Sequence, residues 1–154
     1  MVKPIPENYP RVIPYLHVEG ASAAIDFYVE VLDATERGRM PGDSPEKVGH
    51  AELAIGDSVV MLADEVPDMG IRGPKSVGGT PVTVCVYVED VDAVVERATA
   101  AGARVLCPVE DQFYGDRSGT FEDPFGHQWN IMTHVEDVDP EEMQRRMAQM
   151  AGGG

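Results

Sequence analysis

Residues 15–34 read YLHVEGASAAIDFYVEVLDA, and residues 84–103 read VCVYVEDVDAVVERATAAGA. Each stretch combines a β-rich run with a helix in which the apolar residues recur on one face. At an offset of about 70 residues, Val18-Glu19 falls on Val88-Glu89. Self-similarity at a fixed offset indicates that one supersecondary unit is used twice. The sequence therefore predicts two related units, each too small to hold a stable core alone.

The segments that flank both stretches repeat the same order of elements. Gly56-Asp57 suits the turn of a β-hairpin, and the turn 123–126, DPFG, suits a type I turn between two further strands. The predicted strands are 11–18, 35–40, 48–55 and 58–63 in the first unit, and 81–88, 104–109, 118–122 and 127–133 in the second. The order is therefore βαβββ, a linker over 65–80, and βαβββ again.

The helices have recognisable ends. The first helix is predicted over 20–32, and the second begins after the N-cap Asp90 and closes at Gly102. Asp139-Pro140 opens a last helix. We therefore expect an α+β fold in which paired βαβββ modules form a cupped eight-stranded mixed sheet, followed by a C-terminal helix.

The expected domain organisation follows from this order. A single domain over 1–137 contains the two modules, at about 11–64 and 81–134. Residues 138–154 form the C-terminal helix and a tail, in which the last three glycines, 152–154, are expected to be disordered.

Composition narrows the classes of partner. The chain has 154 residues, with 12 Lys and Arg against 27 Asp and Glu, a net charge of −15. Because phosphate backbones and anionic membranes require basic surfaces, this charge argues against a nucleic-acid or membrane partner and favours a neutral or cationic ligand. Two cysteines, Cys85 and Cys107, without a CxxC pair suit a reducing compartment. The N-terminal residues lack an apolar run, so we expect a cytoplasmic protein.

Three segments carry a resemblance to a known superfamily. They are IPYLHVEGASAAIDFYVEVL at 13–32, GHAELAIGDSVVMLAD at 49–64, and QFYGDRSGTFEDPFGHQWNI at 112–131. They resemble the vicinal oxygen chelate superfamily, which includes glyoxalase I, extradiol dioxygenases and the fosfomycin- and bleomycin-resistance proteins. Within it, the GDR and DPFGHxW motifs of the last segment are similar to the PhnB-like branch. The resemblance covers about residues 11–137.

This resemblance implies a fold in which four strands each supply one ligand to a divalent metal. The implied positions fall on Ile13, Thr83, Asn130 and, within one residue either way, Met61. Isoleucine has no lone pair, Thr and Asn are weak neutral donors, and Met is a soft ligand, so this set does not suit the metals of the superfamily. We therefore expect no metal and no cofactor.

Side-chain alternation along strands extends the candidate site. Residues two apart from the four positions share their face and would line the same cup, as a concave small-molecule site. Cys85 is expected there as a small buried thiol, and His17 at the mouth of the cup. The candidate ligand-binding residues are Ile13, Tyr15, His17, Met61, Thr83, Cys85, Tyr87, Gln128, Asn130 and Met132.

Three functions fit these observations. The first is a metal-free small-molecule-binding protein of the PhnB-like or bleomycin-resistance-like kind, with a small neutral or cationic ligand. The second is a metal-dependent lyase or dioxygenase of the glyoxalase type. The third is a metal-free isomerase or cyclase that uses His17, Tyr15 or Tyr87 as acid or base. The resemblance also implies a homodimer, and the linker over 65–80 is long enough for modules to be exchanged between chains.

Overall fold

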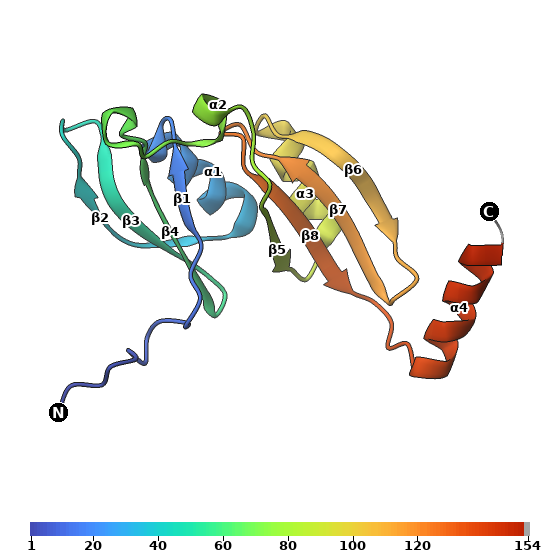
Figure 1. The fold of residues 1–154 in the computed structure, drawn as a ribbon. Coiled ribbons are helices and arrows are strands. Elements are labelled where there is room, and N and C mark those ends of the chain that lie inside the picture. Colours follow the sequence, from blue (N-terminus) through green and yellow to red (C-terminus); the bar gives the residue numbers. More distant parts are fainter. Residues whose placement is uncertain (153–154) are drawn as a thin grey trace.

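The computed structural model describes residues 1–152 and contains both predicted modules (Figure 1). The first module comprises β1 (Tyr15–Val18), α1 (Ala21–Leu32), β2 (Thr35–Pro41), β3 (Val48–Ile55) and β4 (Ser58–Asp64). The second comprises β5 (Thr83–Tyr87), α3 (Val91–Ala100), β6 (Arg104–Asp111), β7 (Asp116–Glu122) and β8 (Gln128–His134). The α+β fold of paired βαβββ modules is confirmed, and α4 (Pro140–Gly152) is the predicted C-terminal helix.

The eight strands form two four-stranded mixed sheets. Their orders are β1-β4-β3-β2 and β5-β8-β7-β6. In each sheet the first strand pairs in parallel with the fourth, and the other pairs are antiparallel. The edge strands β1 and β5 face each other across the middle of the molecule (Figure 1).

Equivalent hydrogen bonds at equivalent places confirm the internal repeat. The Asp64 carboxylate at the end of β4 accepts the backbone N–H of Ala21, the first residue of α1, at 2.9 Å. The Thr133 hydroxyl near the end of β8 accepts the N–H of Val91, the first residue of α3, also at 2.9 Å. The first N–H groups of a helix have no intrahelical partners. In each module, a side chain at the end of the last strand accepts one of them.

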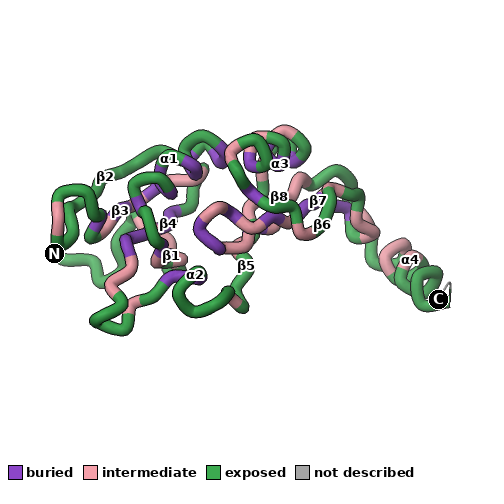
Figure 2. Tube along the Cα trace, turned by 90° about the horizontal axis from the view of Figure 1, so that it is seen from above, coloured by how far each residue is buried: buried purple, intermediate pink, exposed green. Residues whose placement is uncertain are grey.

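One hydrophobic core joins the two modules on the helix side of the sheets. The side chains of Tyr28 from α1 and Phe121 and Trp129 from the second sheet are fully buried, and α1 and α3 lie against each other, with Arg97 donating to the Val31 carbonyl at 3.0 Å. Figure 2 shows the buried stretches concentrated where the helices meet the strands. The opposite faces of both sheets are left open.

Several helix and strand boundaries differ from the expectations by one or two residues, and three differences go further. β1 begins at Tyr15 rather than at residue 11, because Pro10 and Pro14 have no N–H to donate to a ladder. The linker over 65–80 is not a plain loop, since it contains a 3₁₀ turn (Pro67–Met69) and the short helix α2 (Pro74–Val77). Gly152 was expected in the disordered tail and is instead the last residue of α4, while 153–154 lie outside the described residues.

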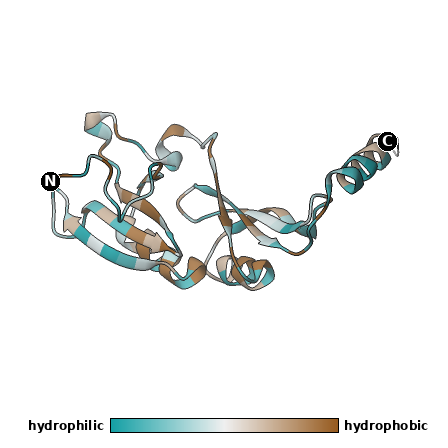
Figure 3. Ribbon diagram, turned by 90° about the horizontal axis from the view of Figure 1, so that it is seen from below, coloured by the Kyte–Doolittle hydropathy of each residue, from teal (hydrophilic) through white to brown (hydrophobic). Residues whose placement is uncertain are grey.

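The helix α4 projects from the end of the second sheet (Figure 1). No residue of α4 is buried, and Figure 3 shows it largely in the colour of hydrophilic residues, next to the C-terminus. Its attachment is polar: the Arg146 guanidinium donates to the Phe113 carbonyl at 2.8 Å and pairs with Glu136. None of the helices in residues 1–152 has the length and apolarity needed to cross a membrane.

Candidate functional site

The strand register places the first group of candidate residues on the open face of the first sheet. Tyr15 pairs with Met61, and His17 pairs with Ala63. The alternate residues of these strands, such as Leu16 and Leu62, are buried in the core. Met61 is therefore the residue of its strand that shares the face of Tyr15, and its two neighbours point toward the helix side.

The second group lies on the open face of the second sheet. The pairs are Thr83 with Gln128, Cys85 with Asn130, and Tyr87 with Met132. Trp129 and Ile131, which alternate with them, are fully buried. The expectation of a buried Cys85 thiol is wrong: Cys85 is exposed on the edge strand β5.

Six of the ten candidate residues line separate hollows in the single chain. Tyr15 and His17 line a cavity of about 570 Å³ whose lining also includes Asp43, Lys47 and Asp68. Ile13 and Met61 line a second, open hollow together with residues of the N-terminal segment. Cys85 and Tyr87 line a third hollow beside the β3–β4 turn. The structure thus brings the candidates together in two groups, one on each sheet, because the modules are joined through α1 and α3 on the opposite side.

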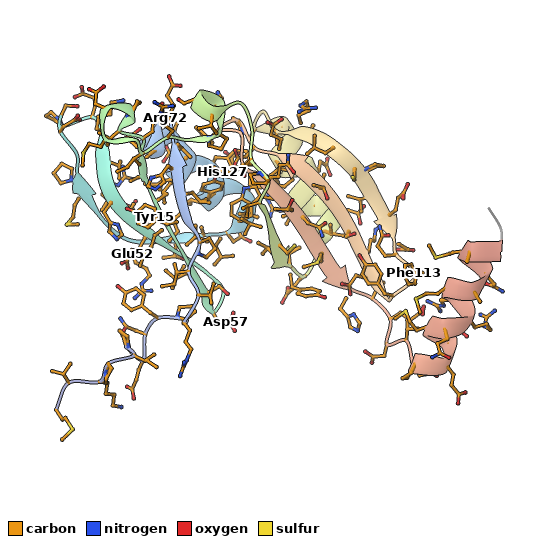
Figure 4. The ribbon with its side chains drawn as sticks, viewed as in Figure 1. Tyr15, Glu52, Asp57, Arg72, Phe113 and His127 are labelled. Atoms are coloured by element: carbon orange, nitrogen blue, oxygen red, sulfur yellow. The ribbon has the colours of Figure 1, made fainter. Side chains whose placement is uncertain are left out.

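A chain of hydrogen bonds crosses the open face of the first sheet. The Tyr15 hydroxyl lies 2.9 Å from His50 Nδ1, and His50 Nε2 lies 3.3 Å from the Glu52 carboxylate. The hydroxyl of Tyr9, from the N-terminal segment, donates to both Glu52 oxygens at 3.0 and 2.9 Å. Figure 4 shows Tyr15 and Glu52 on the same side of this sheet. This Tyr–His–Glu arrangement is able to hold or move a proton.

Sequence reasoning missed His50 and Glu52 as site residues. The available signal was their spacing: two polar residues two apart on a predicted strand, with Ala51 between them. Alternation places both on one face and Ala51 on the other, and Ala51 is indeed fully buried.

Burial and hydrogen bonding set the charge states on this face. The Tyr9 hydroxyl, followed by His50, lowers the pKa of the Glu52 carboxyl below its ordinary value, so Glu52 is an anion at neutral pH. Burial raises the pKa of the Tyr15 phenol. Burial, and then the nearby His127, lower the pKa of His17, whose buried Nδ1 has no hydrogen-bond partner in the described residues. The face therefore offers a neutral phenol, a neutral imidazole and a carboxylate.

The second open face carries a different cluster around Asp116. This buried carboxylate accepts the Tyr87 hydroxyl at 2.7 Å and lies 2.8 Å from His134 Nδ1, while His134 Nε2 lies 2.7 Å from Asp137. The bond to His134 lowers the pKa of Asp116, and the bonds to Asp116 and then Asp137 raise the pKa of His134. Both carboxylates thus favour the imidazolium form of His134 over the neutral form.

We expect an NMR titration of His134 to give a midpoint above its ordinary value of 6.5, and Asp116→Asn to lower that midpoint. A histidine with a raised folded pKa contributes stability below its unfolded pKa, and this contribution is lost as the pH rises through the folded pKa. The contribution of Asp116 is lost as the pH falls through its own depressed pKa. The contact should therefore be strongest between these two folded values. A His134 midpoint at or below the ordinary value contradicts the assignment.

The four positions that the resemblance assigns to a metal do not fit one. Asn130 Oδ1 accepts the Thr120 hydroxyl at 3.3 Å, and Thr83 lies beside Gln128 at 3.5 Å, so their oxygens already have neutral partners. Ile13 and Met61 line an apolar hollow on the other sheet. Divalent metals of this kind select imidazole and carboxylate ligands. Within residues 1–152, no group of three or more His, Cys, Asp or Glu side chains is placed to hold a metal ion.

Comparison with known proteins identifies the family. The uncharacterized protein Rv0887c of Mycobacterium tuberculosis is 46% identical over 147 residues, which cover 94% of this chain and 86% of that protein. The crystal structure of TioX from Micromonospora sp. ML1 matches with a TM-score of 0.63 and 30% identity, over 82% of this chain and 99% of TioX. The PhnB protein of Bacillus cereus matches with a TM-score of 0.63 over 80% of this chain and 99% of its own; at 20% identity it shows the fold alone. The family description "Glyoxalase/Bleomycin resistance protein/Dioxygenase superfamily" matches residues 14–131, and the chain belongs to this superfamily.

Proposed function

We propose that the protein is a metal-free, PhnB-like small-molecule-binding protein that holds its ligand against the open faces of its sheets. The observation that carries this proposal is the side-chain set Ile13, Met61, Thr83 and Asn130, which stands where the superfamily's metal ligands would fall. A concave surface that combines apolar and polar side chains is the general form of a small-molecule site, and the cavity lined by Tyr15, His17, Met69 and Ile71 has this form.

The charge of the cavity favours a cationic ligand. Among its lining residues, Asp64 and Glu65 already accept backbone N–H groups. The carboxylates of Asp43 and Asp68 outnumber Lys47, the one Lys or Arg of the lining. The net charge of −15 adds a long-range attraction for positive ligands. An ammonium group would also be stabilised over the ring of Tyr15.

The proposed assembly is a homodimer. Tyr15 is 41% exposed and Tyr87 is 62% exposed in the single chain, and β1 and β5 are both sheet edges with unpaired backbone groups. Exposed aromatic side chains and unpaired strand edges favour aggregation unless another surface covers them. A second copy that laid its open face over that of the first would cover both and would close the cup around a ligand. The free cysteines suit a cytoplasmic setting for such a protein.

Two alternative functions remain within the same superfamily. A glyoxalase-type lyase or dioxygenase is supported by family membership alone, and family membership does not determine chemistry. A metal-free isomerase is favoured by one specific observation, the Tyr15–His50–Glu52 chain, which could pass a proton to and from a bound substrate.

The test is native mass spectrometry of protein purified from its own host, which reports subunit count, metal content and bound ligand in one measurement. The proposal expects a dimer mass with a co-purified organic molecule and no stoichiometric transition metal. One metal ion per subunit would overturn the proposal and support the glyoxalase-type reading.

Thermal unfolding gives an independent check. We expect Ni²⁺, Zn²⁺, Mn²⁺ or Fe²⁺ to leave the melting temperature unchanged, since the four residues offer no suitable ligands. A metal at about 100 times its dissociation constant would stabilise the folded state by ~2.7 kcal/mol, which is a readily measured shift. Such a shift, abolished by Asn130→Ala but kept in Asp26→Ala on the exposed face of α1, contradicts the metal-free site.

A further inference from the structure

We propose that Tyr15 presents its hydroxyl oxygen to the cavity as a hydrogen-bond acceptor, and so selects ligands that carry an N–H or O–H donor over ligands of equal charge without one. The inference deepens the proposed binding function and rests on it. It follows from the direction of the hydrogen bonds that join Tyr15 to His50 and Glu52.

The Glu52 carboxylate determines the direction of these hydrogen bonds. Its two oxygens accept the Tyr9 hydroxyl at 3.0 and 2.9 Å, and its side chain is only 17% exposed. A carboxylate has no proton and can only accept hydrogen bonds. The neighbouring His50 Nε2, 3.3 Å away, must therefore carry the proton and donate it to Glu52.

The second step fixes the proton of Tyr15. A neutral imidazole with its proton on Nε2 has a lone pair on Nδ1 and accepts there. The Tyr15 oxygen lies 2.9 Å from this nitrogen, so the phenol donates its proton to His50. The hydroxyl has no other proton, and its remaining lone pairs are the only hydrogen-bonding capacity that it can offer to a ligand.

The third step concerns position. The Tyr15 ring is held between two imidazoles, with ring centroids 5.0 Å from His17 and 5.6 Å from His50. Tyr15 lines the cavity of about 570 Å³ and also the hollow between β1 and β5, where Val84 and His127 stand opposite. A fixed acceptor at this place stabilises a donor, and an ammonium donor more strongly because the bond is charge-assisted. A ligand oxygen without a proton would meet the lone pairs of Tyr15 and gain no bond.

The test uses two cationic probes of the same aromatic skeleton, benzylammonium and benzyltrimethylammonium. Both carry one positive charge, but only the first has N–H donors. Dissociation constants are measured by NMR titration at a pH where the ¹⁵N shifts show that the His50 imidazole is neutral. The measured quantity is the ratio of the trimethyl constant to the ammonium constant. Tyr15→Phe should lower this ratio by about tenfold, which corresponds to the loss of one hydrogen bond to a charged group. Tyr114→Phe, at an exposed loop, should leave the ratio unchanged.

A second variant separates hydrogen-bond direction from packing. In Glu52→Gln the Tyr9 hydroxyl can donate to the amide oxygen, which turns the amide NH₂ toward His50 Nε2. The imidazole proton then moves to Nδ1, Tyr15 becomes the acceptor of that bond, and its own proton points to the ligand. The ¹⁵N shifts of His50 should report the Nε2–H tautomer in the parent protein and the Nδ1–H tautomer in the variant. The ratio should fall about as far as in Tyr15→Phe, although Tyr15 is unchanged.

Each outcome decides between the two proposals. If both probes bind at the cavity and the ratio is the same in the parent, Tyr15→Phe and Glu52→Gln proteins, the acceptor role of Tyr15 is wrong and the binding function stands. A parent protein with His50 in the Nδ1–H tautomer also overturns the acceptor role. If neither cation binds to the parent protein, the proposed cationic site fails, and the role of Tyr15 fails with it.

Discussion

Asp123→Ala is expected to lower the free energy of unfolding by about 3–5 kcal/mol. Asp123 is 3% exposed and stands in the DPFG turn between β7 and β8. Its Oδ1 accepts the backbone N–H groups of Phe125 and His127 at 2.9 and 3.0 Å, and its Oδ2 accepts the Trp129 indole at 2.9 Å and the Tyr28 hydroxyl. Alanine would leave four donors without a partner, and each buried unpaired donor costs about 1–3 kcal/mol before the structure relaxes.

Chemical denaturation followed by tryptophan fluorescence measures this loss, because Trp129 is the only tryptophan and is fully buried. Asp26→Ala, on the exposed side of α1, is the matched control and should change stability by no more than about 0.5 kcal/mol. Tyr28→Phe removes only one of the four donors and should cost less than Asp123→Ala. A loss under about 1 kcal/mol in Asp123→Ala would show that the turn does not depend on its carboxylate.

Asp123 also shows what the sequence can predict and where prediction stops. The DPFG turn and its flanking strands follow from local turn chemistry, and the structure has them at β7 and β8. The bond from Tyr28 to Asp123 joins residues 95 apart in the chain and ties α1 to the second module. Local patterns carry no information about such a contact, so the side on which the modules join could not be read from the sequence.

The candidate site divides in the same way. Alternation correctly placed Tyr15 and His17 on one face, because the period of a strand is fixed by its backbone geometry. The position of Met61 came from the resemblance, within one residue either way, and the register pairs it with Tyr15. The same alternation places His50 and Glu52 on one face of β3. They were not predicted because β3 carries none of the positions implied for a metal. The role of Tyr9 could not be predicted from the sequence. Its segment shows no helix or strand periodicity, and its contact with Glu52 joins residues 43 apart in the chain.

The exposure of Cys85 has a related cause. A cysteine between Val84 and Val86 in a β-rich run is typical of a buried strand, yet β5 is an edge strand with an open face. The sequence predicts which residues alternate, but whether a face is covered depends on the packing of a second layer. In the proposed dimer that layer is a second copy of the chain.

Gly115→Ala is expected to release the C-terminal segment from the body of the protein. Gly115 has φ +102°, a conformation that side chains strongly disfavour, and an added Cβ would lie 2.2 Å from the Glu136 carbonyl oxygen. The Gly115 carbonyl also accepts the N–H groups of Val135 and Glu136 at 2.9 and 3.0 Å, which fasten the chain between β8 and α4. A backbone clash cannot be relieved by a rotamer change, so the segment must move away.

The consequence should be local, because no residue of α4 is buried and the core does not depend on it. Hydrogen exchange followed by mass spectrometry should show faster exchange over residues 135–152 in Gly115→Ala, with α1, α3 and the inner strands still protected. Gly38→Ala is the control, since nothing lies within 4 Å of the added Cβ there. Equal loss of protection across both sheets would instead mean that the segment after β8 is part of the cooperative core. The polar ties of Arg146 and His134 would then have to be counted as core contacts rather than as a surface attachment.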